Sequence, residues 1–481
     1  MAETTESADT RWRSPDRKWW VLAVVGAGTF MSALDGSVVN TALPVIGRTT
    51  GAPVSTLEWV VLIYLLTASS SLLVFGRLAD IYGQRGIYIT GLAVFVGGSV
   101  LCGLSPSVAA LIGFRALQAL GAAILFALAP AVLTGAFPGQ ERGRALGLQA
   151  TMTYLGLSTG PALGGFLTHH FGWPSIFFIN VPIGAVVISV ALRVLRLEVS
   201  GSRQPFDPAG AAALAISMAA LLLALSKGGE IGWRSPLILA SVIVAAAGFA
   251  SFVAVERRIR HPVLDLKLFA NRTFTASTTA AFLNYMATSS VNFLMPFYLI
   301  LASNYEPDAA GLALIATPLT MAVLAGPSGW LSDRIGQRLP ATLGMALTVT
   351  GMLFLRTLHA GSTLIEVTPR LALIGLGVGL FTSPNNSAIM GSAPGNRQGV
   401  AGAILAAARN TGFAMGVAVS GLIYTTRLGS LATSLPRPEA ITRAMHDATT
   451  GIALVAIVGV VISALRGSSA DEGSLVLSAG P

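Results

Sequence analysis

Long hydrophobic runs separated by short polar segments form the main pattern of this chain. A helix that spans a membrane needs about 20 predominantly apolar residues. The pattern predicts fourteen such helices, near residues 20–43, 57–76, 87–104, 108–136, 142–168, 174–195, 208–226, 236–254, 273–302, 309–331, 340–358, 364–390, 398–425 and 449–465. The first run is not expected to be a cleavable signal, because it follows a polar leader, exceeds the length of a signal core and contains Asp35.

The composition also indicates an integral membrane protein. Of the 481 residues, 53% are hydrophobic and 11% are charged, whereas soluble proteins carry about 25% charged residues. The net charge of +9 is spread over short basic groups between the apolar runs, which fits loops beside anionic lipid better than a nucleic-acid surface. The single cysteine, Cys102, excludes an internal disulfide. We expect no metal and no cofactor, since no phosphate-binding loop or metal-ligand spacing occurs.

The distribution of lysine and arginine sets the expected orientation, because cytoplasmic loops are enriched in both. With the N-terminus inside, about 20 of them fall on the cytoplasmic side and about 7 fall outside. We therefore expect a multi-pass protein of the cell (inner or plasma) membrane with both termini in the cytoplasm.

Several sequence features occur twice at a nearly constant separation. The segment Gly76 to Arg85 recurs as Gly329 to Arg338, an offset of 253, and Ser37 to Pro44 recurs as Ser289 to Pro296, an offset of 252. The remaining features pair Arg115 and Phe126 with Arg370 and Phe381 and, more loosely, Gly156, Gly160 and Gly164 with Gly412, Gly416 and Ser420. The chain is therefore predicted to contain two copies of a six-helix unit.

The repeat also sets the expected domain organisation. It predicts a cytoplasmic leader at 1–19, an N-terminal six-helix bundle at 20–200, two inserted transmembrane helices within 201–256, a C-terminal six-helix bundle at 257–466 and a cytoplasmic tail at 467–481. The halves have the same orientation, since an even number of helices separates the copies. Parallel halves are typical of rocking transporters, although channels also arise by duplication.

Five motifs resemble those of a known family. They are Leu34 to Pro44, Gly76 to Arg85, Arg115 to Gly121, Gly156 to Gly165 and Trp173 to Gly184. In this order they resemble the major facilitator superfamily and, more narrowly, its 14-helix drug:proton antiporter branch, over residues 20 to 465. The resemblance implies an all-α membrane protein with the major facilitator fold, in which two six-helix bundles and two inserted helices export drugs.

Asp35, Arg115 and Glu58 are the candidates for proton coupling. A charge in mid-span costs ~2.5–3.5 kcal/mol, so an intramembrane acid is a functional candidate by default; the counterpart of Asp35 in the second half is Ala287. Arg115 stays protonated and needs an acceptor, for which Asp35 is a candidate because their helices adjoin in the superfamily. The alternatives are a structural ion pair for Asp35 and a lipid-phosphate anchor for Arg115. Glu58, beside Trp59, is equally well explained as an interfacial charge.

A short cytoplasmic loop and its copy contain the candidate gating residues Gly76, Asp80, Gly83, Arg85, Asp333 and Arg338. Asp80 and Arg85 can form a charge latch between neighbouring helices, and Gly83 permits a tight turn. The alternative is a static reverse turn with solvated charges.

Gly156, Gly160 and Gly164 recur every four residues and therefore share one face of their helix, with Pro161 and Gly165 beside them. Such a face lets another helix approach closely, and close packing is all that the spacing predicts. That these residues mark an exporter is what the resemblance implies, since they match the antiporter motif of the family.

Polar residues within the spans are candidates for the lining of a substrate cavity. They are Asn40, Gln118, Tyr154, Asn284, Asn292, Asn385 and Arg409. Any one of them is more often a packing residue or an interhelical hydrogen-bonding group, and the same alternative applies to Arg370.

The leading hypothesis is a proton-driven exporter of lipophilic compounds, with Asp35 as the proton carrier and Arg115 as its modulator. Its partners would be a small lipophilic substrate, protons and membrane lipids, without nucleic acid. We expect a monomer and no enzyme activity. The same fold could export or flip an endogenous lipid or metabolite. A non-transporting scaffold is the alternative from another class, and it has no need of a buried acid.

Overall fold

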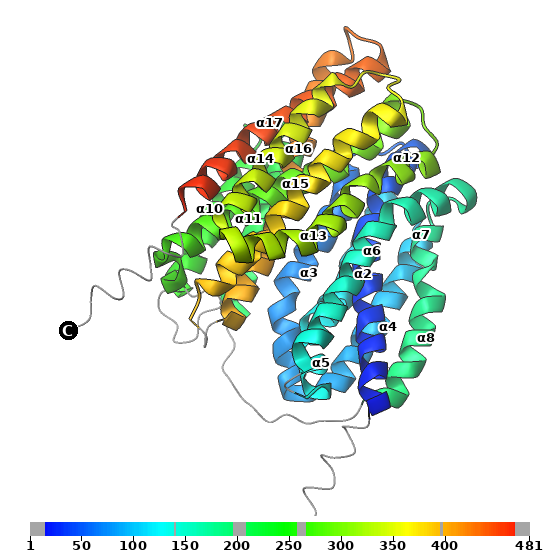
Figure 1. Ribbon diagram of the computed structural model, residues 1–481. Coiled ribbons are helices and arrows are strands. Elements are labelled where there is room, and N and C mark those ends of the chain that lie inside the picture. Colours follow the sequence, from blue (N-terminus) through cyan, green and yellow to red (C-terminus); the bar gives the residue numbers. More distant parts are fainter. Residues whose placement is uncertain (1–14, 139–140, 196–207, 257–265, 395–397, 467–481) are drawn as a thin grey trace, which may run out of the picture. The chain divides into compact units, whose positions relative to one another are not determined.

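The computed structural model describes residues 15–138, 141–195, 208–256, 266–394 and 398–466. Every regular element in these ranges is a helix (Figure 1). The helices are α2 (Pro15–Thr50), α3 (Val54–Tyr82), α4 (Gln84–Gly103), α5 (Val108–Ala136), α6 (Arg142–Phe171), α7 (Ser175–Phe178), α8 (Asn180–Val194), α9 (Pro208–Ile231), α10 (Pro236–Glu256), η3 (Leu266–Ala270), α11 (Arg272–Phe297), η4 (Tyr298–Ala302), α12 (Pro307–Leu314), α13 (Ala316–Ile335), α14 (Arg338–Phe354), η5 (Leu355–Thr357), α15 (Leu364–Gly391), α16 (Gln398–Leu431) and α17 (Arg437–Leu465).

Twelve helices in these ranges are long and apolar enough to cross a membrane. They lie at twelve of the fourteen predicted positions, and α6 and α9 occupy the other two. α6 is a continuous helix, but glycine, serine and threonine interrupt its apolar sequence. In α9, the apolar helix within the described residues covers Ile216–Gly228, which is shorter than a membrane span. The chain is therefore an all-helical multi-pass membrane protein, and the count of fourteen is not confirmed.

The helices cluster into two compact units. Unit 1 comprises residues 1–52 and 59–212, and unit 2 comprises residues 53–58 and 213–481. The division falls inside α3, whose first turn belongs to unit 2 and whose remainder belongs to unit 1. The inserted helix α10 and most of α9 belong to unit 2.

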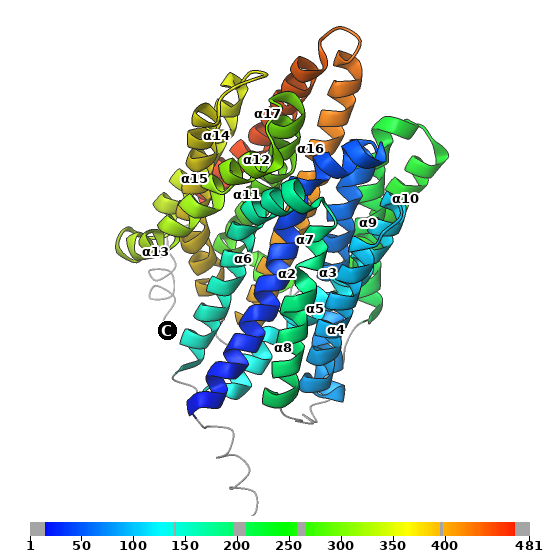
Figure 2. The same ribbon diagram turned by 90° about the vertical axis from the view of Figure 1, so that its right-hand side faces the viewer.

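In unit 1, α2 packs along α6 and α4 packs along α5, with α8 against α4 (Figures 1 and 2). Glycine makes the α2–α6 contact close. A Cβ atom on Gly156, Gly160 or Gly164 would lie 2.5, 1.8 or 2.7 Å from atoms of α2. No side chain fits at such distances, so the glycine face of α6 lets the two helix backbones approach each other.

Unit 2 repeats these pairings, with α11 along α16 and α14 along α15. A Cβ atom on Gly416 would lie 2.1 Å from Ser289 Oγ on α11. Ser37 and Ser289, which correspond in the sequence repeat, each donate a hydrogen bond across the contact, Ser37 to Gly156 O at 3.4 Å and Ser289 to Phe413 O at 3.0 Å. The sequence repeat therefore corresponds to a structural repeat, in which the helix pairings inside unit 1 recur inside unit 2.

The last two long helices extend beyond the apolar runs that predicted them. The runs end at 425 and resume at 449, whereas α16 continues to Leu431 and α17 begins at Arg437. Ala440, Ala444 and Ala448 are buried at four-residue spacing on α17, while Arg427 pairs with Asp447 at 2.6 Å on the polar side. The extension of α17 is amphipathic, so a criterion based on apolar run length did not detect it.

Candidate functional site

Asp35 and Arg115 form an ion pair in the interior of unit 1. α2 contributes Asp35 and α5 contributes Arg115, and both side chains are fully buried. Arg115 Nη1 donates to Asp35 Oδ2, and Arg115 Nε donates to the carbonyl of Val60 on α3 at 3.1 Å. A buried ion pair is stable only when further hydrogen bonds offset the loss of hydration, and the surrounding side chains supply them.

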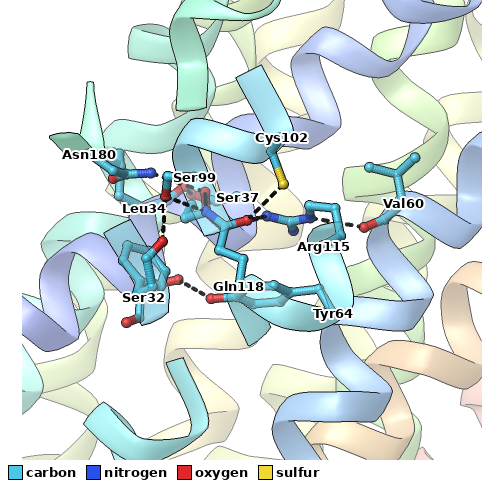
Figure 3. A network of polar contacts seen from close by, with 12 residues as sticks. Ser32, Leu34, Ser37, Val60, Tyr64, Ser99, Cys102, Arg115, Gln118 and Asn180 are labelled. Carbon is cyan, nitrogen blue, oxygen red and sulfur yellow. Dashed lines mark hydrogen bonds and ion pairs between the residues drawn. The ribbon is translucent and has the colours of Figure 1, made fainter. Parts of the chain in front are cut away.

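Two amide side chains, those of Gln118 and Asn180 (labelled in Figure 3), complete the coordination of the Asp35 carboxylate. Gln118, one turn after Arg115 on α5, donates to Asp35 Oδ1 at 2.8 Å and accepts from Arg115 Nη1 at 2.8 Å. Asn180, the first residue of α8, donates to the same Asp35 oxygen at 3.2 Å. The acid and the base are therefore held by neutral amides as well as by each other.

An outer layer of side chains fixes these groups in turn. Gln118 Nε2 also donates to Ser99 Oγ on α4 at 2.7 Å. The Tyr64 ring on α3 lies 4.2 Å from the guanidinium carbon of Arg115, a cation–π contact, and its hydroxyl donates to Ser32 O at 2.9 Å. Side chains from α2, α3, α4, α5 and α8 thus converge on one point of unit 1 (Figure 3).

This arrangement can hold or release a proton. The carboxyl group of Asp35 exists as acid or carboxylate, whereas a guanidinium remains charged in proteins. If Asp35 is protonated, Arg115 keeps its bonds to Gln118 and Val60 but loses its counter-charge. Arg115 Nη2 makes no hydrogen bond within the described ranges, so the guanidinium retains a donor that another acceptor can use.

The sequence did not single out two members of this network. Ser99 belongs to none of the motifs, and Asn180 lies inside the run Trp173 to Gly184 without a charge that distinguishes it. Both are neutral polar residues in apolar helices, where such residues are common. The available signal for Asn180 was its position between apolar residues in that run.

Glu58, the third candidate for proton coupling, belongs to unit 2. Its side chain is fully buried in the first turn of α3. Its carboxyl oxygen Oε2 lies against Gly421 of α16, where an added Cβ would be only 1.9 Å away. The choice between proton coupling and an interfacial charge for Glu58 stays a prediction.

The gating candidates form two equivalent turns. Gly83 has φ 94° between α3 and α4, and Gly336 has φ 83° between α13 and α14. Residues other than glycine rarely adopt this backbone conformation. Gly76 lies within α3, where an added Cβ would meet nothing within 4 Å. Glycine is thus required at the turn but not at position 76.

The described charged side chains of these turns have separate surroundings. Arg85 Nη2 donates to the carbonyl of Leu192 at the end of α8 at 2.8 Å. Asp333 and Arg338 are exposed, with no hydrogen bond or ion pair to each other in the described ranges. The side chain of Asp80 lies outside the described residues, so the latch stays a prediction.

The candidate cavity residues lie in different environments. Gln118 belongs to the ion-pair network, Asn40 is half-buried on α2, and Tyr154 and Asn292 are exposed. Asn284 is buried and donates to Met345 Sδ at 3.3 Å. Arg409 is half-buried on α16 and contacts Asn410 Oδ1 at 3.5 Å. None of these contacts distinguishes a cavity role from packing.

Asn385 lies in a polar cluster around Arg466, the residue after α17. Its Nδ2 donates to Ser277 O at 3.0 Å, and its Oδ1 accepts from Arg466 at 3.3 Å. Arg466 also donates to the carbonyl of Gln337 in the second turn. Burial, reinforced by the positive charge of Arg338, lowers the pKa of Arg466 to about 10, which leaves it charged at neutral pH. This cluster connects α11, α15, α17 and the turn before α14.

Several known proteins are similar to this chain. The Riboflavin transporter RibZ of Clostridioides difficile (strain 630) is 35% identical over 86% of this chain and 89% of its own length. The Multidrug resistance protein Stp of Mycobacterium tuberculosis (strain CDC 1551 / Oshkosh) is 34% identical over 85% of this chain and 76% of its own. The Tetracenomycin C resistance and export protein of Streptomyces glaucescens is 32% identical over 86% of this chain and 77% of its own.

A solved structure shares the fold at low sequence identity. A bacterial homologue of the human lysosomal transporter Spinster superimposes with a TM-score of 0.70 at 15% identity, covering 94% of this chain and 97% of its own. The sequence profile of the Major Facilitator Superfamily matches residues 25–255 and 277–474. Together with the repeated helix pairings, these matches establish that the chain belongs to the Major Facilitator Superfamily, a family of membrane transporters rather than enzymes.

Proposed function

We propose that this protein exports lipophilic compounds from the cell in exchange for protons, by alternating access. The observation that carries the proposal is the Asp35–Arg115 pair, which is fully buried and bridged by Gln118. An ionisable acid inside a membrane transporter is expensive to maintain. A permanent counter-charge beside it allows both protonation states to exist.

Proton coupling follows from competition between two effects at Asp35. Arg115 and the two amides stabilise the carboxylate, whereas burial stabilises the acid. A conformational change that admits or excludes water alters this balance, so one state loads a proton and the other releases it. A membrane potential of 100 mV supplies about 2.3 kcal/mol per charge moved, and each pH unit supplies about 1.4 kcal/mol.

The proposed substrate class rests on the relatives. Similar proteins are named multidrug resistance proteins and a tetracenomycin C export protein, which supports export of toxic lipophilic compounds and resistance to antibiotics. Riboflavin is a second candidate substrate, because a relative of 35% identity is named a riboflavin transporter. Export of such a metabolite, or flipping of a lipid, would use the same proton site.

The proposal includes the remaining features of the sequence hypothesis. α6 and α9 would also cross the membrane, giving two six-helix bundles and two inserted helices. The transporter would be monomeric and lie in the cell membrane with both termini in the cytoplasm. The turns at Gly83 and Gly336 would act in gating, and the glycine face of α6 would hold α2 during transport.

The test uses purified protein in liposomes with a pH-sensitive dye inside. A panel of lipophilic cations, neutral antibiotics and riboflavin is added to the native protein and to Asp35→Asn. We expect at least one compound to drive proton movement in the native protein, and no proton movement with Asp35→Asn. Glu439→Gln is the control, since Glu439 is an exposed carboxylate in the first turn of α17.

Each outcome has a distinct meaning. Proton movement that persists in Asp35→Asn would overturn the assignment of Asp35 as the proton carrier. A response to riboflavin alone would favour the metabolite transporter over the drug exporter. Silence with every compound would contradict the drug and riboflavin proposals and favour a lipid as the substrate.

A further inference from the structure

The inserted helix α9 is bound to the first turn of α3 in unit 2. Ser226 Oγ, which is buried, donates to the carbonyl of Ser55 at 3.1 Å. The next residue, Lys227, donates from Nζ to Ser55 Oγ at 3.3 Å and to Thr56 Oγ1 at 3.1 Å. An ammonium group is therefore held on the turn that contains Glu58.

Glu58 itself is enclosed by other helices of unit 2. Its carboxyl oxygen faces Gly421 on α16, and the aromatic ring of Phe293 on α11 lies 3.6 Å from the position of a Cβ on that glycine. Among the ionisable groups around the turn, α9 contributes Lys227 and α16 contributes Tyr424, one turn beyond Gly421; Phe293 carries no charge. Lys227 is thus a cation bound directly to the turn that contains Glu58.

Neither charge is favourable here alone. A cation at a helix N-terminus opposes the helix dipole and costs about 0.3–1 kcal/mol. The ammonium of Lys227 on α9 lies against the first turn of α3. A buried carboxylate without a counter-charge loses several kcal/mol of hydration, and Glu58 is fully buried. The two costs offset each other when Lys227 and Glu58 are charged together.

The sequence repeat gives this pairing a place in the molecule. Unit 1 has Asp35 with Arg115, whereas unit 2 has Ala287 at the position of Asp35. The equivalent of Arg115 is Arg370, whose Nε and Nη2 donate to Thr357 Oγ1 at 2.9 and 2.7 Å at the end of η5. The two positions of unit 2 that correspond to Asp35 and Arg115 therefore do not form such a pair.

We infer that Lys227 is the counter-charge of Glu58, so that the inserted helix α9 provides unit 2 with its own acid–base pair. When the Glu58 carboxyl group releases its proton to water, the ammonium of Lys227 neutralises the carboxylate. When Glu58 is protonated, Lys227 retains the hydroxyl oxygens of Ser55 and Thr56. The inserted helices thus act in proton coupling through Glu58, and Lys227 is a positioning residue. The transport consequence rests on the proposed proton exchange; the pairing itself does not.

The pairing is tested by a double-mutant cycle on thermal stability. Glu58→Gln, Lys227→Gln and the double variant are purified in detergent, and the melting temperature of each is measured. We expect each single change to lower the melting temperature by several degrees. The melting temperature of the double variant should lie well above the value that the sum of the two losses would give. Thr56→Val, which removes one acceptor of Lys227 and no charge, should show no such compensation with Glu58→Gln. Strictly additive losses in the double variant would overturn the pairing.

The role in coupling is tested by counting protons moved per substrate in liposomes. Lys227→Gln should lower the count to the value of Glu58→Gln, while Lys227→Arg should restore the native count, because a cation is again present. A native count in Lys227→Gln would overturn the coupling role. If native protein moves no protons with any compound, the proposed function fails, and the thermal cycle still decides whether Lys227 and Glu58 are paired.

Discussion

Gln118 is the residue on which the unit 1 network depends most. Its amide nitrogen donates to Asp35 and Ser99, and its carbonyl oxygen accepts from Arg115. The thiol of Cys102 also donates to this oxygen at 3.6 Å, so removal of this one side chain leaves four buried groups each with one partner fewer. Each buried group left without its hydrogen bond costs about 1–3 kcal/mol.

Gln118→Leu should therefore weaken coupling while the charged pair remains. We expect substrate-driven proton movement to fall about tenfold or more, the equivalent of about 1.4 kcal/mol, and the melting temperature to fall as well. Leu117→Ala is the matched control, because Leu117 is the preceding residue of α5 and is exposed. Equal proton fluxes in Gln118→Leu and Leu117→Ala would show that Gln118 does not position Asp35.

At this scale the sequence identified the charged residues and not their neutral partners. A charge within an apolar run has a high energetic cost, so Asp35 and Arg115 stood out. Ser99 and Asn180 carry no such cost, and only the fold shows that they meet Gln118 and Asp35. The local context of Arg466 also gave no indication that it is buried, because it follows the last apolar run.

Among the helices, the α2–α6 contact offers a sharp test of the glycine face. An added Cβ at Gly160 would lie 1.8 Å from Ser37 Oγ and 2.7 Å from its Cβ, so Gly160→Ala should separate α2 from α6 and lower the melting temperature by several degrees. Gly147→Ala on the same helix meets nothing within 4 Å. It should leave the melting temperature unchanged or raise it, since alanine favours a helix by about 1 kcal/mol over glycine. A stable Gly160→Ala protein would mean that the two helices are not in close contact.

The turn between α3 and α4 depends on a single backbone conformation. Gly83 has φ 94° and ψ 136°, a region that other residues occupy at a cost of about 1–3 kcal/mol. Gly83→Ala should therefore destabilise the turn and slow substrate-driven proton movement in liposomes. Gly86→Ala, three residues later and without a neighbour within 4 Å, should retain native stability and flux. The gating role would be contradicted if Gly83→Ala lost stability and kept its native transport rate.

The positions of the helices could largely be predicted from the sequence. The ends of the helices and the roles of residues related by the repeat could not. Apolar runs located the spans because burial in lipid requires them. They missed the amphipathic extension of α17, which buries only one face, and the mostly exposed last turns of α16. The repeat predicted Arg370 as a mate of Arg115, yet the two side chains differ in role, since Arg370 bonds to the end of η5 and no acid stands at Ala287.

For the whole molecule, the order of the motifs in the sequence predicted the family. The number of transmembrane helices predicted from the sequence is not confirmed. α6 and α9 did not qualify as spans by apolar length. α6 gives up hydrophobic side chains for the glycine face that packs on α2. A helix specialised for close packing is thus less apolar, which is why α6 does not meet the hydropathy criterion although its apolar run is among the fourteen predicted from the sequence.

Accessibility labelling decides this question, because each additional crossing reverses the side on which later loops lie. Single cysteines are introduced at five exposed positions. Three are expected outside the cell, at His170 after α6, Arg234 after α9 and Ser434 before α17, and two are expected in the cytoplasm, at Arg142 and Arg338. The background is Cys102→Ala, since Cys102 is the single cysteine of the chain. In intact cells, an impermeant maleimide should label positions 170, 234 and 434, whereas Arg142→Cys and Arg338→Cys should react only after the membrane is opened. Protection of position 170 or 234 would show that α6 or α9 does not cross and would reduce the number of spans.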